Sequence, residues 1–307
     1  MKKIVVVGGG TVGWLTALFV RKYWENTDIT LIASSKIGIL GAGEGTTPNF
    51  PGLLRRLEIN ENEFIEKTGC TKKYGIEFIN WRGDNKSFKH NFQRDSEMFA
   101  YHFDARLVAK YLQDISEERN VNYIDGLITG FNEDEFGINQ IVLEDGSLID
   151  CDFIFDCSGF QHLIIGKHFK AEWKSYEKDL VCNSAIAFFL PQTNPTIQNE
   201  KTWTQGIAMK YGWVWGAPLK HRWGCGYVYS DKYVDADTVL KEAEEYYGQK
   251  LEVVKHFKFK TGTYKKVWIK NCVAIGLASS FLEPMEATSL MTSIMFLNSL
   301  KQDKIDF

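Results

Sequence analysis

Residues Ile4 to Gly13, which read IVVVGGGTVG, decide the fold. The β-branched run Ile4 to Val7 is typical of a strand buried on both faces, and the apolar residues from Trp14 to Trp24 predict a helix after the glycines. The glycines match GxGxxG, in which the first permits a tight turn, the second lets the backbone approach a pyrophosphate, and the third lets the helix pack on the strand. With a strand expected at Asp28 to Ala33, the chain is predicted to begin with a dinucleotide-binding βαβ unit.

The second strand of this unit departs from the usual pattern. A carboxylate normally ends that strand and holds the adenosine ribose, but here the position reads Ile32-Ala33-Ser34. Either the cofactor binds loosely, or Ser34 or Ser35 replaces the carboxylate. The residues that we assign to cofactor binding in this unit are Gly8, Gly10, Thr11, Val12, Gly13 and Ser34.

Further along the chain, the apolar pattern predicts a second, antiparallel sheet. Thr71 to Trp81 alternate like a strand, and residues 174–230 hold aromatic and β-branched runs separated by turn signals. Residues 272–277 are expected to return to the first sheet. Helices are predicted at Asn49 to Glu66, with a second helix capped by Asn60, and at His102 to Asp114, Asp237 to Tyr247 and Thr288 to Gln302.

The bulk composition favours a globular enzyme that acts on small molecules. The chain has 307 residues, 44% of them hydrophobic, and a net charge of -3, so it offers no basic surface for nucleic acid. The six cysteines form no CxxC pair, which argues against a zinc site and for a reduced, cytoplasmic protein. No apolar run is long enough to span or anchor in a membrane. The oligomeric state stays open, a homo-oligomer included.

Four further segments resemble the flavin-dependent tryptophan halogenases. GAGEGTTP at 41–48 resembles the flavin-covering loop of that family, whose usual form is GVGEATxP, and KYGIEFINW at 73–81 is similar to the segment that carries the catalytic lysine. WVWGAP at 213–218 resembles the signature WxWxIP, and EPMEATS at 283–289 resembles EPLESTG. Without the resemblance, these segments would be a flexible loop, a surface lysine, a packed tryptophan pair and an acidic helix start.

The resemblance implies a fold and a set of site residues. The fold is α/β, an FAD-binding Rossmann-like sheet of the flavin monooxygenase and halogenase type with an inserted antiparallel sheet on the substrate side. Residues 1–170 and 260–307 would form the FAD-binding domain, with 71–102 contributing to the substrate side, and 171–259 the antiparallel domain. The implied residues are Lys73 and Glu286 for catalysis, Gly41, Gly43, Glu44, Gly45, Leu277 and Leu290 for FAD, Thr288 and Ser289 for halide, and Trp213, Trp215 and Pro218 for shielding the flavin.

The implied reaction uses reduced FAD, oxygen and chloride, bromide or iodide. A flavin C4a-hydroperoxide would oxidise the halide to hypohalous acid, which Lys73 would deliver to a small electron-rich aromatic substrate while Glu286 accepts the ring proton. Because no second nucleotide motif follows the first, a separate flavin reductase is expected to supply the reduced FAD. Ala287 and Ser289 depart from the usual EPLESTG; a side chain at Ser289 is expected to alter a backbone angle in the halide site and to favour bromide or iodide.

Two alternatives remain from the sequence. A flavin-dependent aromatic monooxygenase of similar fold would hydroxylate its substrate directly, and an inactive flavin-binding relative would perform neither reaction. His102, in a segment shared with monooxygenases, is interpreted as a packed or helix-capping histidine. The tryptophan halogenases are longer than this chain, so their C-terminal helical region is expected to be absent or truncated here.

Overall fold

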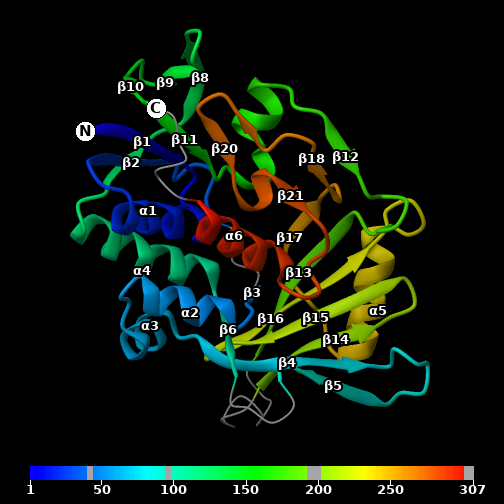
Figure 1. Cartoon of the computed structure of the whole chain (residues 1–307). Coiled ribbons are helices and arrows are strands. Elements are labelled where there is room, and N and C mark those ends of the chain that lie inside the picture. The colour runs from blue at the N-terminus through cyan, green and yellow to red at the C-terminus, as the bar shows by residue number, and fades with distance from the viewer. Residues whose placement is uncertain (40–43, 94–97, 192–201, 301–307) are drawn as a thin grey trace.

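The computed structural model describes residues 1–39, 44–93, 98–191 and 202–300, which fold around two large sheets (Figure 1). The first sheet has the strand order β19-β20-β11-β1-β2-β7 and is parallel except at its edge strand β19. Its strands are β1 (Lys2–Val7), β2 (Thr27–Ala33), β7 (Asn122–Asp125), β11 (Phe153–Asp156), β19 (Trp268–Ile269) and β20 (Cys272–Ala274). The predicted strand at the start of the chain is confirmed, and it lies inside the sheet.

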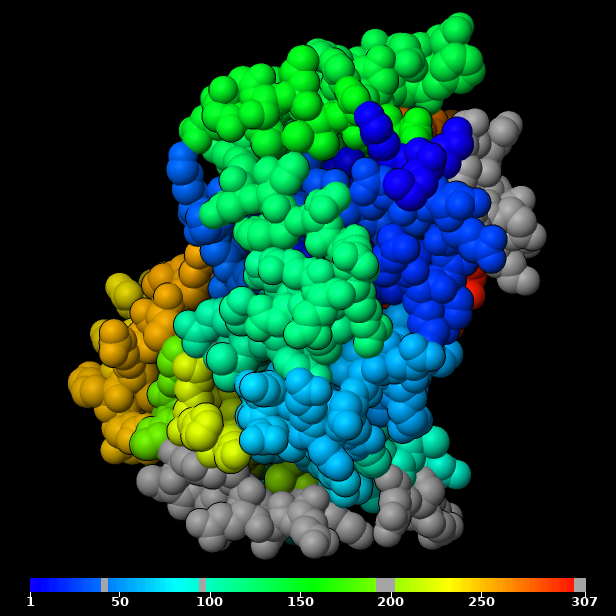
Figure 2. Space-filling view, turned by 90° about the vertical axis from the view of Figure 1, so that its left-hand side faces the viewer, coloured from blue at the N-terminus to red at the C-terminus, as the bar shows by residue number. Residues whose placement is uncertain are grey.

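Both faces of this sheet are covered, which explains why β1 is apolar throughout. Ile4 and Val6 pack against helices α1 (Thr11–Tyr23), α4 (Ala105–Glu118) and α6 (Thr288–Ser299). Val5 and Val7 pack on the other side, against a three-stranded meander and the short helix η2. These covering elements are β8 (Ile128–Glu133), β9 (Ile138–Leu143), β10 (Leu148–Asp150) and η2 (Leu163–His168). Figure 2 views the helical side, with the meander at its upper end and α4 across its middle.

Two short helices follow the loop at residue 48. They are α2 (Asn49–Arg56) and α3 (Glu61–Thr68), and Asn60 caps α3 by accepting hydrogen bonds from the amides of Asn62 and Glu63. The predicted cap at Asn60 is therefore confirmed. Because α2 contacts α6, these helices extend the layer that covers the first sheet.

The second sheet is larger and joins segments that are far apart in the sequence. Its order is β17-β13-β16-β15-β14-β4-β6-β3, with β5 paired to β4, and β14 runs parallel to β4. Helix α5 (Ala236–Tyr247) packs on one face. The strands are β3 (Glu44–Gly45), β4 (Thr71–Ile79), β5 (Ser87–Asn91), β6 (Ala100–Phe103), β13 (Ser184–Pro191), β14 (Thr202–Ala208), β15 (Gly212–Pro218), β16 (Arg222–Tyr229) and β17 (Val253–Lys258).

The arrangement of sheets confirms the predicted fold class. A small third sheet lies beside the two large ones and is formed by β12 (Trp173–Ser175), β18 (Gly262–Tyr264) and β21 (Ser280–Phe281). Strands β4, β5 and β6 join the larger sheet; that residues 71–102 belong to the substrate side stays a prediction. The domain boundaries proposed at 170/171 and 259/260 stay a prediction.

The predicted helix at His102 begins too early. His102 lies in strand β6, where it pairs with Thr71, and α4 begins only after Asp104, whose carboxylate caps the helix through the Arg106 amide. The packed alternative for His102 is the one that the structure supports, since its side chain is fully buried. Among the described residues no helix is both long and apolar enough to cross a membrane.

Candidate functional site

The glycine turn between β1 and α1 is held by two close contacts. Gly8 has φ +116°, and a Cβ added there would lie 2.3 Å from the carbonyl oxygen of Cys157. A Cβ at Gly13 would lie 1.8 Å from the carbonyl oxygen of Gly8. Both glycines are therefore required by packing within the chain itself.

Gly10 differs from these two because the chain leaves the space beside it open. A Cβ at Gly10 would meet no atom within 4 Å, and Gly10 caps α1 without any side-chain hydrogen bond. The next residue, Thr11, has a buried hydroxyl oxygen that finds no hydrogen-bond partner among the described residues. Uncapped amides at a helix start, a free hydroxyl and an open glycine face together fit a phosphate group.

Val12 connects this turn to the other end of the chain. A Cβ at Gly276 would lie 3.3 Å from both Val12 methyl groups, so the short helix η4 (Gly276–Ala278) sits against the start of α1. Leu277 in η4 packs beside the tryptophans of the second sheet, whereas Leu290 in α6 packs on the helical face of the first. Of the residues predicted to hold the cofactor, Leu290 faces a different hydrophobic core from Leu277.

A carboxylate that the sequence pattern does not indicate lies beside the end of β2. The amide of Ser35 donates a hydrogen bond of 2.9 Å to the Asp125 carboxylate, and Asp125 ends the neighbouring strand β7. This hydrogen bond lowers the pKa of Asp125. Ser34 lies immediately after β2, beside this carboxylate group. Gly41 and Gly43, predicted to contact FAD, lie outside the described residues.

The described part of the predicted flavin-covering loop forms the edge strand β3. Gly45 pairs with His102 and Glu44 pairs with Phe103 on β6. Burial raises the pKa of Glu44 to about 7, and the charge of Asp104 adds to this increase. A Cβ at Gly45 would lie 2.9 Å from Lys73 Nζ, so this loop borders the predicted catalytic amine.

Lys73 is the most unusual lysine of the described chain because its side chain is only 1% exposed. Burial lowers the pKa of Lys73 to about 8, and the negative charge of Glu286 acts in the opposite direction. Glu286 itself is exposed. The two predicted catalytic residues are thus near enough for the charge of Glu286 to favour the protonated amine.

Two features around Lys73 do not emerge from sequence reasoning. The pairing of β4 with β14 shifts register between Lys73 and Ile76, which places a β-bulge directly after the lysine. In addition, the Phe92 ring lies 5.5 Å from Lys73 Nζ. Phe92 is therefore an aromatic wall of the site, and its only sequence signal is its position one residue beyond β5.

The tryptophan pair of β15 lies on the same face of the large sheet as Lys73. Thr204 borders the Lys73 amine, and alternation along β14 puts Gly206, which pairs with Trp215, on that face as well. Trp213 is buried and donates a hydrogen bond of 3.1 Å to Glu283. Burial raises the pKa of Glu283. The first glutamate of the EPMEATS segment therefore holds Trp213, a role that the sequence does not predict.

Trp215 and Pro218 are held by neighbouring strands. A Cβ at Gly226 would lie 1.9 Å from the Trp215 ring, so this glycine makes room for the tryptophan. The carbonyl oxygen of Pro218 accepts a hydrogen bond from the Thr71 hydroxyl. Trp215 is thus packed against β16, and Pro218 is tied to β4, the strand of Lys73.

The predicted halide residues are at the start of α6. Thr288 and Ser289 are its first two residues, and Ala287 caps the helix with no side-chain hydrogen bond. The amides of this first turn therefore have no partner within the helix. That the Ser289 side chain alters a backbone angle in the halide site stays a prediction: Ser289 lies within the helix, and the positive φ of +56° in this turn falls on Ala287.

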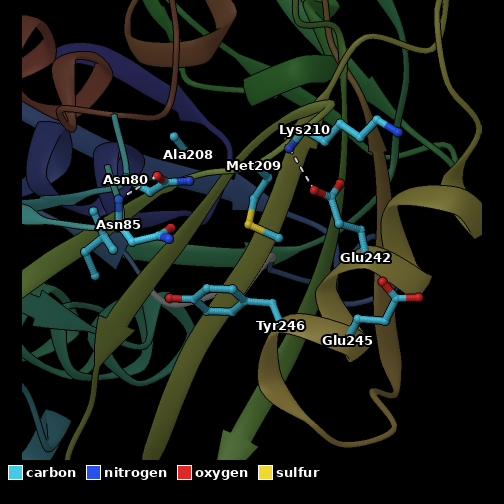
Figure 3. A pocket seen from close by; sticks show the side chains of 9 residues that line it. Asn80, Asn85, Ala208, Met209, Lys210, Glu242, Glu245 and Tyr246 are labelled. Atoms are coloured by element: carbon cyan, nitrogen blue, oxygen red, sulfur yellow. Dashed lines mark hydrogen bonds between the residues drawn. The ribbon is translucent and has the colours of Figure 1, made fainter. Parts of the chain in front are cut away.

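A separate pocket opens on the opposite face of the large sheet, beside α5 (Figure 3). Its volume is about 680 Å³, and Ile79, Met209 and Tyr246 line it together with polar side chains. Glu242 already accepts hydrogen bonds from the Lys210 amide and the Tyr227 hydroxyl. None of the predicted site residues lines this pocket. Within the described residues, no group of three His, Cys, Asp or Glu side chains could hold a metal ion.

Comparisons with known proteins point to one family. The tryptophan halogenase family profile matches residues 3–98 and 93–303. Tryptophan 7-halogenase RebH of Lentzea aerocolonigenes is 29% identical over 356 residues, which cover 94% of this chain and 67% of that protein. Tryptophan 6-halogenase ThaL of Streptomyces albogriseolus is 28% identical, with the same coverage of 94% and 67%. The structure of Xcc4156, a flavin-dependent halogenase from Xanthomonas campestris, is 31% identical, with a TM-score of 0.91 over 99% of this chain and 72% of that one.

Proposed function

The chain belongs to the tryptophan halogenase family, and from this premise we propose that it halogenates an electron-rich aromatic substrate with reduced FAD, oxygen and a halide. The observation that carries the proposal is the buried amine of Lys73, which interacts with the charge of Glu286. Lys73 lies on the sheet face that also holds the tryptophan pair. A surface lysine would have no comparable surroundings.

FAD fits the residues at the start of α1. Gly10 and the α1 amides would hold its pyrophosphate, Thr11 would add a hydroxyl, and Gly45 and Leu277 would border its flavin. When bound and reduced, FAD would supply the chemistry that activates oxygen and oxidises the halide. A separate flavin reductase is proposed as the source of electrons, since one nucleotide motif is present. Product formation with NADH and this chain alone would refute that part.

The halide would bind at the start of α6. The first amides of a helix and its dipole favour an anion, and Thr288 and Ser289 provide those amides. The change from serine to alanine at 287 removes a side-chain oxygen from this turn. We propose a preference for bromide or iodide over chloride, and a competition assay that yields mainly chlorinated product would contradict it.

Lys73 would receive the oxidised halogen and present it to the substrate. Because its pKa is about 8, part of the Lys73 population is the neutral amine near neutral pH. A neutral amine can take the halogen from hypohalous acid, which releases water and leaves a haloamine, or it can hold hypohalous acid by a hydrogen bond. Glu286 would accept the proton that the aromatic ring loses. Trp213 and Trp215 would keep the substrate away from the flavin.

The test is mass spectrometry of an indole and phenol panel incubated with the chain, FAD, a flavin reductase and each halide in turn. Halogenated products that disappear in Lys73→Ala and persist in Lys72→Ala would support the proposal, because Lys72 is an exposed neighbour on the same strand. Hydroxylated products would indicate a monooxygenase instead. No product with any halide would indicate an inactive flavin-binding relative.

A further inference from the structure

A chain of hydrogen bonds runs through the buried His102 toward Lys73. The Thr71 hydroxyl donates to the carbonyl oxygen of Pro218. His102 Nδ1 lies 3.4 Å from the Thr71 hydroxyl oxygen, and His102 Nε2 lies 2.8 Å from the Thr204 hydroxyl oxygen. His102 is fully buried, and Thr204 is 8% exposed. These residues come from β6, β4, β14 and β15, so the chain of bonds crosses four strands of the large sheet.

The direction of each hydrogen bond follows from the proton count. Thr71 has one hydroxyl proton and gives it to Pro218, so its oxygen can only accept from His102 Nδ1–H. Burial and the charge of Lys73 both lower the pKa of His102, which keeps the imidazole neutral. A neutral imidazole protonated at Nδ1 accepts at Nε2, so Thr204 must donate its only hydroxyl proton to His102. The remaining lone pairs of the Thr204 oxygen can therefore only accept.

The Thr204 oxygen faces the same small space as the Lys73 amine. A Cβ added at Gly45 would lie 3.4 Å from Thr204 Oγ1 and 2.9 Å from Lys73 Nζ. Gly45 stands where the usual form of this loop has alanine, so the present sequence leaves the space free.

The other ionisable groups on the elements packed around the Lys73 amine differ in the groups with which they interact. Glu286 attracts the amine, Glu44 interacts chiefly with Asp104, and the Lys72 amine lies 4.6 Å from the centre of the Phe99 ring.

We propose that His102 and Thr204 are positioning residues for Lys73, in which the neutral histidine fixes the Thr204 hydroxyl so that its oxygen attracts the amine into the space beside Gly45. This inference rests on the proposed function of Lys73 as the residue that carries the halogen. Neither residue would touch the halogen. Their effect would be to set the resting position and the protonation of the amine.

The experiment measures the Lys73 pKa directly, by NMR of the full chain labelled with ¹⁵N-lysine. The Lys73 Nζ signal is assigned by its loss in Lys73→Arg and then followed against pH. If the proposal holds, Thr204→Val removes the oxygen that attracts the ammonium form, so the Lys73 pKa should fall by about one pH unit. Thr204→Ser keeps the hydroxyl and should titrate like the parent. Thr261→Val is the matched control, since Thr261 is a buried threonine whose hydroxyl bonds the Leu180 carbonyl instead.

A second variant keeps the test decisive if Thr204→Val does not fold. In Gly45→Ala the added methyl group would fill the shared space, move the amine away from the Thr204 oxygen and also lower the Lys73 pKa. An unchanged Lys73 pKa in either variant that folds would overturn the proposal, as would an equal fall in Thr204→Ser.

Because this NMR measurement needs no turnover, it stands even if no halogenated product forms. If product does form, the limb of its pH profile that follows Lys73 should move in Thr204→Val by the same amount as the NMR pKa, and a profile that stays with the parent would contradict the positioning role.

Discussion

Replacing Lys73 by methionine should stabilise the protein while it abolishes halogenation. The Lys73 side chain is 1% exposed, and burial lowers its pKa from 10.5 to about 8. At about 1.4 kcal/mol for each pH unit, this difference corresponds to about 3 kcal/mol of unfolding free energy. Methionine has a similar length and no charge to bury, so Lys73→Met should recover most of that amount at pH 7.

The stability advantage of Lys73→Met should shrink as the pH rises. Between pH 8 and pH 10.5 the unfolded chain binds more protons than the folded chain at this residue, so the stability of the parent rises with pH in that window. The advantage of Lys73→Met should therefore be about 3 kcal/mol at pH 7 and only about 1.4 kcal/mol at pH 9.5.

The assay is urea unfolding of the flavin-free protein, followed by tryptophan fluorescence at both pH values. Lys72→Met is the control, because it removes the same charge from an exposed position on the same strand. The reasoning fails if Lys73→Met is no more stable than Lys72→Met at pH 7, or if its advantage does not shrink at pH 9.5.

Four other substitutions test separate parts of the structure. Gly13→Ala should abolish both FAD binding and folding, because its Cβ would lie 1.8 Å from the Gly8 carbonyl oxygen. In contrast, Gly10→Ala should leave the melting temperature unchanged and weaken only FAD binding. Fluorescence titration with FAD and thermal melts compare the two variants. Glu44→Gln should flatten the pH dependence of stability between pH 4.5 and 7. The raised pKa of Glu44 in the folded state makes the parent lose stability as pH rises through that range. Urea unfolding midpoints measured between pH 4.5 and 7 would show the difference. Ala287→Gly should raise the unfolding free energy by about 1 kcal/mol by relieving the left-handed backbone, and an unchanged urea midpoint would argue against strain there.

The first sheet was predictable from local sequence, whereas the second sheet was predictable only in outline. The strand at Ile4 to Val7 and the glycines that follow it permit only one arrangement, a strand that is covered on both faces. A run of β-branched residues before GxGxxG requires this burial. In contrast, the end of β6 from His102 onward was interpreted as part of a helix. His102 directly precedes a helical pattern, and its pairing with Thr71, 31 residues away, and with Gly45 makes it a strand.

Some residues of the site were likewise predictable from the sequence, and others were not. Lys73, Glu286 and the tryptophan pair were indicated by their segments. Lys73 and the tryptophans lie on one face of the large sheet, and Glu286 is near enough for its charge to favour the protonated amine. The supporting residues could not be identified in this way. Glu283 binds Trp213 across 70 residues and Thr204 binds His102 across 102, and no local spacing encodes contacts of that length. The positive φ at Ala287 was not predicted, because the exact start of α6 depends on the turn before it.

The parallel pairing of β4 with β14 also bears on how the chain folds during its synthesis. Lys72 and Thr202 contact each other 130 residues apart. At typical rates of translation, β4 is complete about 6 to 26 seconds before β14 emerges. During that interval one edge of β4 has no partner, and the Trp81 side chain lacks the Gly206 carbonyl that it later binds. An unpaired strand edge next to exposed aromatic residues invites association between nascent chains, so slower growth at low temperature or added chaperones should increase the soluble yield.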